Sequence, residues 1–273
     1  MDNKRISAQR RAGEILGWGL EKTLSQIKPG VTEIALNDFF EEYITKRGGF
    51  PGFKKVPGYK HAICVATNDV VVHGIPGKRV LKENDIICID AGVYMDGYHT
   101  DMGETIRVEN GKLKVESLDE DEIDKFLRVG KQTMFAAIAQ ARIGNRIGHI
   151  SKVIQEGIEG AGYCVVRSLI GHGVGKTLHE KPEIPGILQG TVESTPRIVK
   201  GAALAIEVIY TMGKADVVYS GNDGWTIVTK DGSLSAVFER SVLVTRDDPE
   251  IITRLSSDSD WEARLVTPIA KPI

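Results

Sequence analysis

Residues 86–105, IICIDAGVYMDGYHTDMGET, carry the strongest structural signal in this 273-residue chain. Two apolar-rich runs flank Asp96-Gly97, a dipeptide typical of a two-residue type I′ turn between antiparallel strands. If these two residues form the loop, Met95 pairs with Tyr98. The sequence therefore predicts a β-hairpin with a defined register.

That register places two carboxylates on one face of the hairpin. Gly92 would lie opposite Asp101, and Asp90 would lie opposite Gly103. The two aspartates are then diagonal neighbours, roughly 7 Å apart at the backbone. Each faces a glycine, so the space beside it is left unfilled.

The aspartate pair has no local cation, because residues 83–106 contain six acidic residues and no Lys or Arg. Two like charges this close need a distant base, a shared proton or a metal ion. The alternative is an ordinary solvated polar face, since charged residues are mostly exposed.

The composition is that of an ordinary globular protein, 41% hydrophobic with a formal charge of -2. This length can bury a sizeable core as one large domain or two fused halves. No basic stripe favours nucleic acid as the main partner. Three widely spaced cysteines (Cys64, Cys88 and Cys164) fit a reducing compartment better than a disulfide framework. With no recognisable signal peptide or membrane-spanning run, a cytoplasmic location is expected.

Hydrophobic periodicity and turn residues predict the other main elements. Helices are expected at 6–27, 32–46 and 122–141, and strands at 61–66, 70–73, 202–210 and 236–245. A charged connector is expected at 109–122.

A weak internal echo relates the two halves of the chain. Aligning Gly30 with Gly144 sets Gly48 beside Gly162, so a loop, a helix and a double-glycine ending recur. We interpret this as two related halves packed together, although two amphipathic helices can also resemble each other by chance. The expected organisation is one catalytic domain at 1–255, with halves at about 1–110 and 111–255, and a tail of unknown role at 256–273.

The second half supplies further candidate ligands. Glycines flank His172 in the segment 168–182, and Glu207 and Glu239 interrupt two apolar strands. Each Glu alone could point to solvent from an edge, and His172 or His179 could be an ordinary loop histidine. The internal echo changes this interpretation because it places Glu207 at the position equivalent to Asp90.

Two Asp, two Glu and one His form an oxygen-rich set. Such a set suits two divalent ions of Co, Mn, Fe or Zn type better than one closed structural zinc. Two metals about 3.5 to 4 Å apart are an established arrangement for activating water in hydrolysis. The sequence therefore predicts a dinuclear hydrolase site.

Over about residues 11–253 the chain resembles the type I methionine aminopeptidases of the creatinase/aminopeptidase, or pita-bread, family. The matching stretches are NDVVVHGIP (68–76), IDAGVYMDGYHTDMGET (89–105), GHGVGKTLHEKP (171–182), AIEV (205–208) and GWTIVTKDGSLSAVFE (224–239). The resemblance implies an α+β fold of two pseudo-symmetric halves, with a curved, mainly antiparallel sheet covered by helices. It also implies metal-dependent removal of an N-terminal methionine that precedes a small residue.

The resemblance assigns roles to particular residues. The implied metal ligands are Asp90, Asp101, His172, Glu207 and Glu239, with Asp101 and Glu239 bridging the ions. His179 would hydrogen-bond the scissile carbonyl, His73 would bind near the scissile nitrogen, and Glu207 would shuttle a proton. Tyr59, Cys64, Leu178 and Trp225 match positions that line the methionine pocket, although ordinary core packing is the alternative for them. The implied partners are nascent polypeptide N-termini near the ribosome, and the protein is expected to be a monomer without a membrane partner.

Two departures from the family pattern follow the glutamates. Val208 stands where the family usually has Pro, and Arg240 where it usually has His. Strand alternation predicts that both side chains point away from the metals. The residues at 184–200 also lack a clear match.

Two rival functions are weighed against this one. An Xaa-Pro aminopeptidase or dipeptidase shares the ligands and the fold, but usually carries an extra N-terminal domain for which the residues before His73 leave no room. The other rival is an inactive binding module for ribosomes, RNA or proteins. Such a module would be expected to lose ligands or gain a basic surface, and neither is seen in the sequence.

Overall fold

A computed structural model describes residues 3–109, 121–221 and 223–261 of the chain. The helices are α1 (Asn3–Leu24), α2 (Glu33–Thr45), α3 (Glu122–Ile138) and α4 (Ile147–Glu159), with 3₁₀ turns η1 (Gly52–Lys55) and η2 (Val192–Ser194). The strands are β1 (Phe50–Pro51), β2 (Ile63–Thr67), β3 (Val70–Val72), β4 (Ile86–Met95), β5 (Tyr98–Arg107), β6 (Cys164–Val165), β7 (Ile170–Gly173), β8 (Glu180–Pro185), β9 (Ala203–Thr211), β10 (Val217–Tyr219), β11 (Ile227–Thr229), β12 (Ser235–Leu243) and β13 (Glu250–Ile251). None of these helices is both long and apolar enough to cross a membrane.

The predicted hairpin is confirmed as β4 and β5. Met95 pairs with Tyr98, and the register continues through Gly92 opposite Asp101 to Asp90 opposite Gly103. Asp96 and Gly97 both have positive φ, 51° and 95°, as a type I′ turn requires. The turn residues therefore fix which side chains of the two strands share a face.

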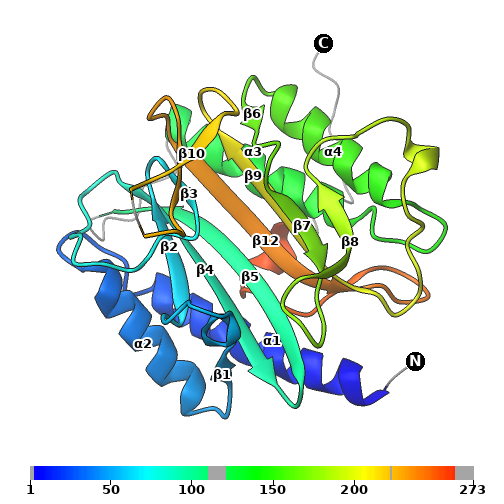
Figure 1. The fold of residues 1–273 in the computed structure, drawn as a ribbon, viewed down its shortest axis with the longest axis horizontal. Helices are drawn as coiled ribbons and strands as arrows, with labels where there is room; N and C mark the ends of the chain where they lie inside the picture. Colours follow the sequence, from blue (N-terminus) through cyan, green and yellow to red (C-terminus); the bar gives the residue numbers. More distant parts are fainter. Residues whose placement is uncertain (1–2, 110–120, 222, 262–273) are drawn as a thin grey trace.

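The large sheet has a pseudo-symmetric strand order, β1-β4-β5-β12-β9-β7-β8. Off this path, β2 pairs with β4, β6 with β9 and β13 with β12. The hairpin strands β4 and β5 belong to the first half of the chain, and β9 and β12 belong to the second. Figure 1 shows β5 and β12 side by side in the middle of the sheet. The two halves thus meet at a seam between these two strands, and β4 and β9 occupy equivalent places on either side of it.

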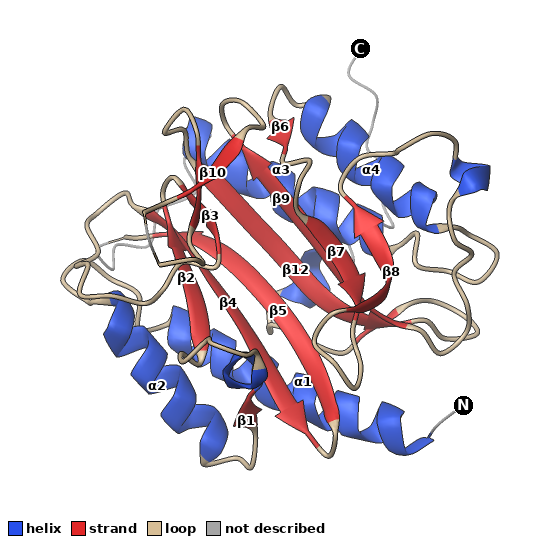
Figure 2. Ribbon diagram, in the orientation of Figure 1, coloured by secondary structure: helices blue, strands red, loops and turns tan. Residues whose placement is uncertain are grey.

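Helices cover one face of the large sheet, as Figure 2 shows. Alternate residues of β4, such as Ile87 and Ile89, pack with Leu16 of α1 and Phe40 of α2 in one buried cluster. The residues that alternate with them, Cys88 and Asp90, face the opposite side and line a cavity. A small separate sheet of β10, β11 and β3 also contributes residues to that cavity.

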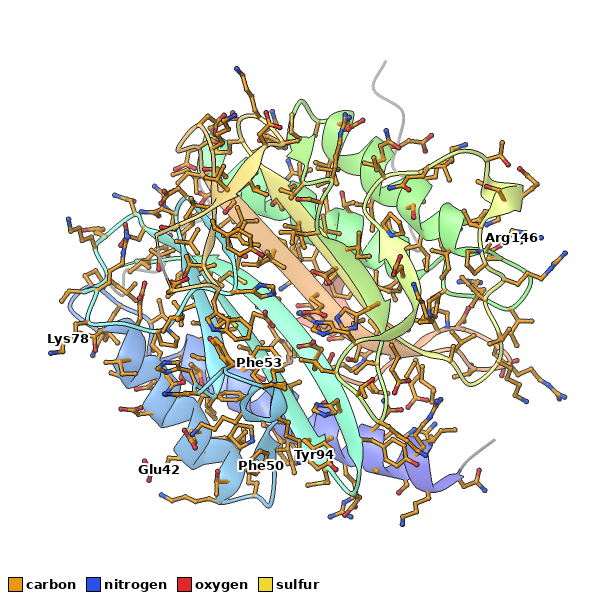
Figure 3. The ribbon with its side chains drawn as sticks, in the orientation of Figure 1. Glu42, Phe50, Phe53, Lys78, Tyr94 and Arg146 are labelled. Carbon is orange, nitrogen blue, oxygen red and sulfur yellow. The ribbon has the colours of Figure 1, made fainter. Side chains whose placement is uncertain are left out.

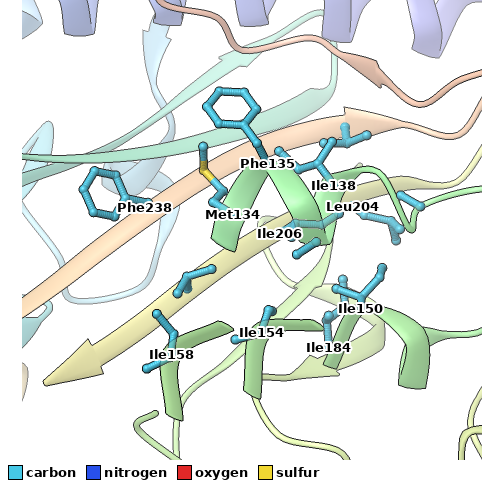
Figure 4. Packing of buried hydrophobic residues seen from close by; sticks show 14 of the residues in the cluster. Met134, Phe135, Ile138, Ile150, Ile154, Ile158, Ile184, Leu204, Ile206 and Phe238 are labelled. Carbon is cyan, nitrogen blue, oxygen red and sulfur yellow. The ribbon is translucent and has the colours of Figure 1, made fainter. Parts of the chain in front are cut away.

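The second half is covered in the same way by α3 and α4. Ile147, Ile150, Ile154 and Ile158 recur at helical spacing along one face of α4 and are buried. Figure 4 shows Ile150, Ile154 and Ile158 below β9, and on the other side of that strand Phe238 of β12 together with Met134, Phe135 and Ile138 of α3. The matching cover on both halves leaves only the other sheet face for a site.

The predicted elements are present with shifted ends. The helix expected at 6–27 is α1, and the strands expected at 61–66 and 236–245 are β2 and β12. The poorly matched stretch 184–200 contains the end of β8 and the turn η2. Most of the expected connector at 109–122 lies outside the described residues, as does the tail beyond residue 261.

Candidate active site

A cavity of about 130 Å³ lies on the sheet face opposite the helices. Its volume is several times what a single water needs, roughly 10–15 Å³ on the same scale. Every residue that the sequence analysis singled out as a ligand, catalytic group or pocket residue lines it: Tyr59, Cys64, His73, Asp90, Asp101, His172, Leu178, His179, Glu207, Trp225 and Glu239. Folding thus brings together residues that span more than half of the polypeptide.

Strand register places the carboxylates in one row across four strands. Asp90 pairs with Gly103, Gly103 with Glu239, and Glu239 with Glu207. Directly opposite residues of antiparallel strands point to the same face. Asp90, Glu239 and Glu207 therefore all point into the cavity, with Gly103 between Asp90 and Glu239. Asp101 joins them from the diagonal position on β5.

The imidazole of His172 meets these carboxylates from β7, which pairs with β9 at Ala205. Its Nε2 atom lies 3.8 Å from Oδ2 of Asp101 and 4.0 Å from Oε1 of Glu207. The ligand atoms of Asp101, His172 and Glu239 all lie within 4.8 Å of one another. The Nδ1 atom of His172 donates to the carbonyl oxygen of Gly173 at 2.9 Å, which leaves the Nε2 lone pair directed at the carboxylates.

Burial makes this carboxylate cluster unfavourable without a cation. It raises the pKa of Asp90 to about 7, and burial followed by the charge of Asp90 raises the pKa of Asp101 and Glu207. The pKa of Glu239 is raised by burial and then by Asp101. Among the residues that the structure describes, the Oδ1 atom of Asp90 and the Oε1 atom of Glu239 are buried and have no hydrogen-bond partner.

Those two unpartnered oxygens and the cluster of like charges fit a site for divalent cations. A cation of that kind prefers carboxylate and neutral imidazole ligands, which is the donor set present. Burial, and secondarily His179, lowers the pKa of His172 to about 4, so its imidazole is neutral near pH 7 and free to coordinate.

Two further histidines lie beside the carboxylates. The ring of His179 is 4.4 Å from the ring of His172, at an interplanar angle of 70°. His73 follows β3 with a φ of 56°, a conformation that is uncommon for residues other than glycine. Strain of this kind concentrates at functional sites. Burial, followed by the nearby charge of His179, lowers the pKa of His73.

The apolar end of the cavity contains the predicted pocket residues. The rings of Tyr59 and Trp225 lie 5.1 Å apart, edge to face, and the hydroxyl of Tyr59 donates to the carbonyl oxygen of Ile63 at 2.8 Å. Cys64 and Leu178 belong to the same buried cluster. One end of the cavity is therefore ionic and the other is apolar.

Phe53 and Val56 also line this apolar end, and the sequence analysis did not single them out. Figure 3 labels Phe53 where the loop around η1 crosses the sheet. A Cβ atom at Gly92 of β4 would lie only 3.0 Å from the ring of Phe53, so the missing side chain at Gly92 leaves room for that ring. Gly52, next to Phe53, was a sequence signal that this segment could approach the site closely. The Gly, Pro and Lys residues around it predicted only an ordinary loop.

The two departures from the family pattern point away from the cavity, as strand alternation predicts. Val208 packs in the core beneath α3 and α4. Arg240 is fully buried on the helix side of β12 and does not line the cavity. The site is therefore not blocked by either residue.

Residues 7–246 match the model of metallopeptidase family M24. A methionine aminopeptidase of Clostridium perfringens is 38% identical over 252 residues, which are 92% of this chain and 97% of that protein. The crystal structure of a methionine aminopeptidase from Thermotoga maritima has a TM-score of 0.86 at 37% identity, covering 93% of this chain and 98% of that one. A prolidase from Pyrococcus furiosus is similar in fold alone, with a TM-score of 0.71 at 19% identity and 65% of its chain covered.

The twofold antiparallel sheet and the buried carboxylate–imidazole cluster at its centre define a metallopeptidase of the pita-bread fold, and this chain belongs to metallopeptidase family M24. Within that family, the two relatives above that are matched over nearly their whole length are methionine aminopeptidases, which confirms the resemblance seen in the sequence. Membership of this metallopeptidase family implies a divalent metal cofactor, and Asp101, His172 and Glu239 form a cluster that could hold a metal ion.

Proposed function

We propose that this protein removes the N-terminal methionine from nascent proteins and peptides whose second residue is small. One observation carries the proposal, namely that an ionic cluster with the donor set of a divalent metal site shares a cavity with an apolar pocket. The relatives that match over nearly their whole length bear the name of this activity.

Five side chains would hold two divalent ions of Co, Mn, Fe or Zn type: Asp90, Asp101, His172, Glu207 and Glu239. The central positions of Asp101 on β5 and Glu239 on β12, at the seam, support a bridging role for these two carboxylates. Ions bound there would polarise the scissile carbonyl and lower the pKa of an attacking water.

The chain's own groups would then orient the substrate and move protons. Glu207, at the ionic end of the cavity, would accept the proton of the attacking water and pass it to the departing nitrogen. His73 would hold that nitrogen. His179 would donate a hydrogen bond to the carbonyl oxygen as negative charge develops on it.

The methionine side chain would enter between Tyr59, Cys64, Leu178 and Trp225. Aromatic faces and thiol or aliphatic groups suit a flexible thioether, which makes favourable contacts with rings. Tyr59 is buried and its hydroxyl is already hydrogen-bonded, so it presents an apolar ring to the pocket.

We place this activity in one catalytic domain at 1–255, with halves at about 1–110 and 111–255 and a tail at 256–273. The substrate would be the N-terminus of a nascent chain near the ribosome. A monomer in the cytoplasm is the form that this role implies, with no specific nucleic acid or membrane partner.

The proposal is tested by methionine release after the metal-free protein is reconstituted with Co, Mn, Fe or Zn. Met-Ala peptides should be cleaved faster than Met-Leu peptides, and Lys-first peptides should remain intact. Preferential cleavage of an Xaa-Pro bond would instead favour the prolidase-type alternative. Binding of metal without release from any peptide would favour an inactive binding module.

A further inference from the structure

The two halves of the sheet meet through a very short backbone ladder. Strands β5 and β12 pair only at Glu239 with Gly103 and at Arg240 with Met102 within the described residues, whereas β4 and β5 pair along their full length. The proposed ligands lie on both sides of this seam. The distances between them therefore depend on whatever fixes β5 against β12.

Side chains replace the missing ladder bonds on both sides of the short pairing. The hydroxyl of Thr105 donates to the carbonyl oxygen of Val237 at 2.6 Å and accepts from its amide at 2.9 Å. At the other side, the hydroxyl of Ser241 accepts from the amide of Asp101 at 2.9 Å and donates to its carbonyl oxygen at 2.8 Å. The separation of the strands is thus set by side chains.

Arg240 binds the middle of the seam from the helix side. Its Nη1 atom donates to the carbonyl oxygens of Glu239 at 2.8 Å and of Gly103 at 3.1 Å, one on each strand. A rigid planar guanidinium that donates to both strands fixes their separation in a way that a flexible ammonium cannot. One of the two carbonyls belongs to a proposed bridging ligand.

A residue from the C-terminal segment holds that guanidinium in place. Asp258 is fully buried and accepts from Nε and Nη2 of Arg240 at 2.8 and 2.9 Å. Glu104 of β5 accepts from Nη2 at 2.6 Å, and Lys131 of α3 donates to Glu104 at 2.6 Å. The two cations and two anions balance, so the cluster is neutral and its polar groups are paired, as burial demands.

We propose that Arg240 and Asp258 are positioning residues that set the spacing of the metal ligands across the seam. The inference rests on the proposed function, because it assigns these residues a task only if the cavity binds metal. The segment that follows β13 would then influence the geometry of the site from the helix side of the sheet. Asp258 itself does not line the cavity.

Asp258→Asn is the main test, because it keeps the shape of the side chain while removing its charge. The matched control is Asp260→Asn, an exposed aspartate two positions further along the same segment. We expect Asp258→Asn to weaken Mn or Co binding to the metal-free protein by roughly 10- to 100-fold in calorimetric titration, the range typical of losing a group that orients a ligand. The kcat should fall with it, while KM for a Met-Ala peptide changes less than about twofold.

A second variant separates geometry from charge. Arg240→Lys keeps the cluster neutral but loses the planar fork, so it should also weaken metal binding. Hydrogen exchange of metal-free Asp258→Asn should accelerate at the Asp101 amide, beside the seam, and not at Ile150 in α4. A purely structural role would instead accelerate exchange at both amides.

Metal affinity of Asp258→Asn within twofold of Asp260→Asn would overturn the inference, and so would wild-type affinity in Arg240→Lys. Failure of the wild-type protein itself to bind Mn or Co would overturn the proposed function, and this inference with it. The two failures are therefore distinguishable.

Discussion

Glu207 and Glu239 lie directly opposite each other on β9 and β12, with both side chains on the cavity face of the sheet. Like charges directly opposite on neighbouring strands destabilise a sheet. Burial and nearby acidic groups raise the pKa of both carboxyls. A pair of this kind becomes favourable when a cation is bound between the two carboxylates.

Replacing Glu239 with Ala should abolish turnover. Loss of even an outer-shell partner of a metal ligand costs roughly 10- to 100-fold, so loss of a bridging ligand should lower kcat by more than about 100-fold. Methionine release and metal content should be measured together on the same preparation. Wild-type release by this variant would show that Glu239 is not a ligand.

Replacing His179 with Ala should affect kcat far more than peptide binding. The group is proposed to stabilise charge that appears only in the transition state, and removal of one such donor costs roughly 100- to 1,000-fold. Steady-state kinetics with a Met-Ala peptide separates the two parameters. His149→Ala, on α4 and away from the cavity, should leave both unchanged. An increase in KM alone would assign His179 to ground-state binding.

Replacing Trp225 with Ala should weaken selection of the methionine side chain. The ring packs edge to face on Tyr59 and lines the apolar end of the cavity. Loss of a large apolar contact of about 1.5 to 3 kcal/mol corresponds to roughly a 10- to 150-fold rise in KM, with a smaller change in kcat. Competition between methionine-first and alanine-first peptides would measure the selectivity. Unaltered selectivity would identify Trp225 as a core residue only.

The metal-free protein should lose stability as pH rises from about 6.5 to 8. Burial raises the pKa of Asp90 to about 7 from an unfolded value of about 3.9. A raised pKa means that the folded state binds the proton more tightly, so this contribution is complete below pH 4 and is lost as pH rises through 7. The pKa of Asp101, Glu207 and Glu239 is raised as well, which adds to this loss. His172 acts in the opposite sense because its pKa is lowered, but its contribution ends once the unfolded imidazole, with a pKa of about 6.5, has lost its proton.

Urea unfolding in the presence of a chelator, at fixed ionic strength, would measure this effect. The fall in unfolding free energy should be smaller in Asp90→Asn and smaller again when Mn is added to the wild-type protein. A stability that rises with pH across this interval in the metal-free protein would show that the carboxylates are not protonated as the burial implies.

Local sequence was sufficient for the hairpin and most of the elements. Asp96 and Gly97 dictate a two-residue turn because both adopt positive φ, and the turn sets the register that puts Asp90 and Asp101 on one face. The period-two alternation of β9 and β12 likewise determined that Val208 and Arg240 face away from the cavity. Periodicity and turn chemistry are local properties, so a single sequence displays them.

Only the tertiary structure decided what lies behind the site. Arg240 is paired with Glu104 of β5 and Asp258 of the segment after β13, and Lys131 of α3 is paired in turn with Glu104. No periodic pattern links these three residues along the chain. Tertiary structure also decided the seam, where side-chain hydroxyl groups replace backbone hydrogen bonds between β5 and β12. It likewise decided the position of Phe53, whose ring reaches the cavity because Gly92 leaves space for it. Contacts between residues distant in sequence depend on how the two halves dock, and that geometry exists only in the folded chain.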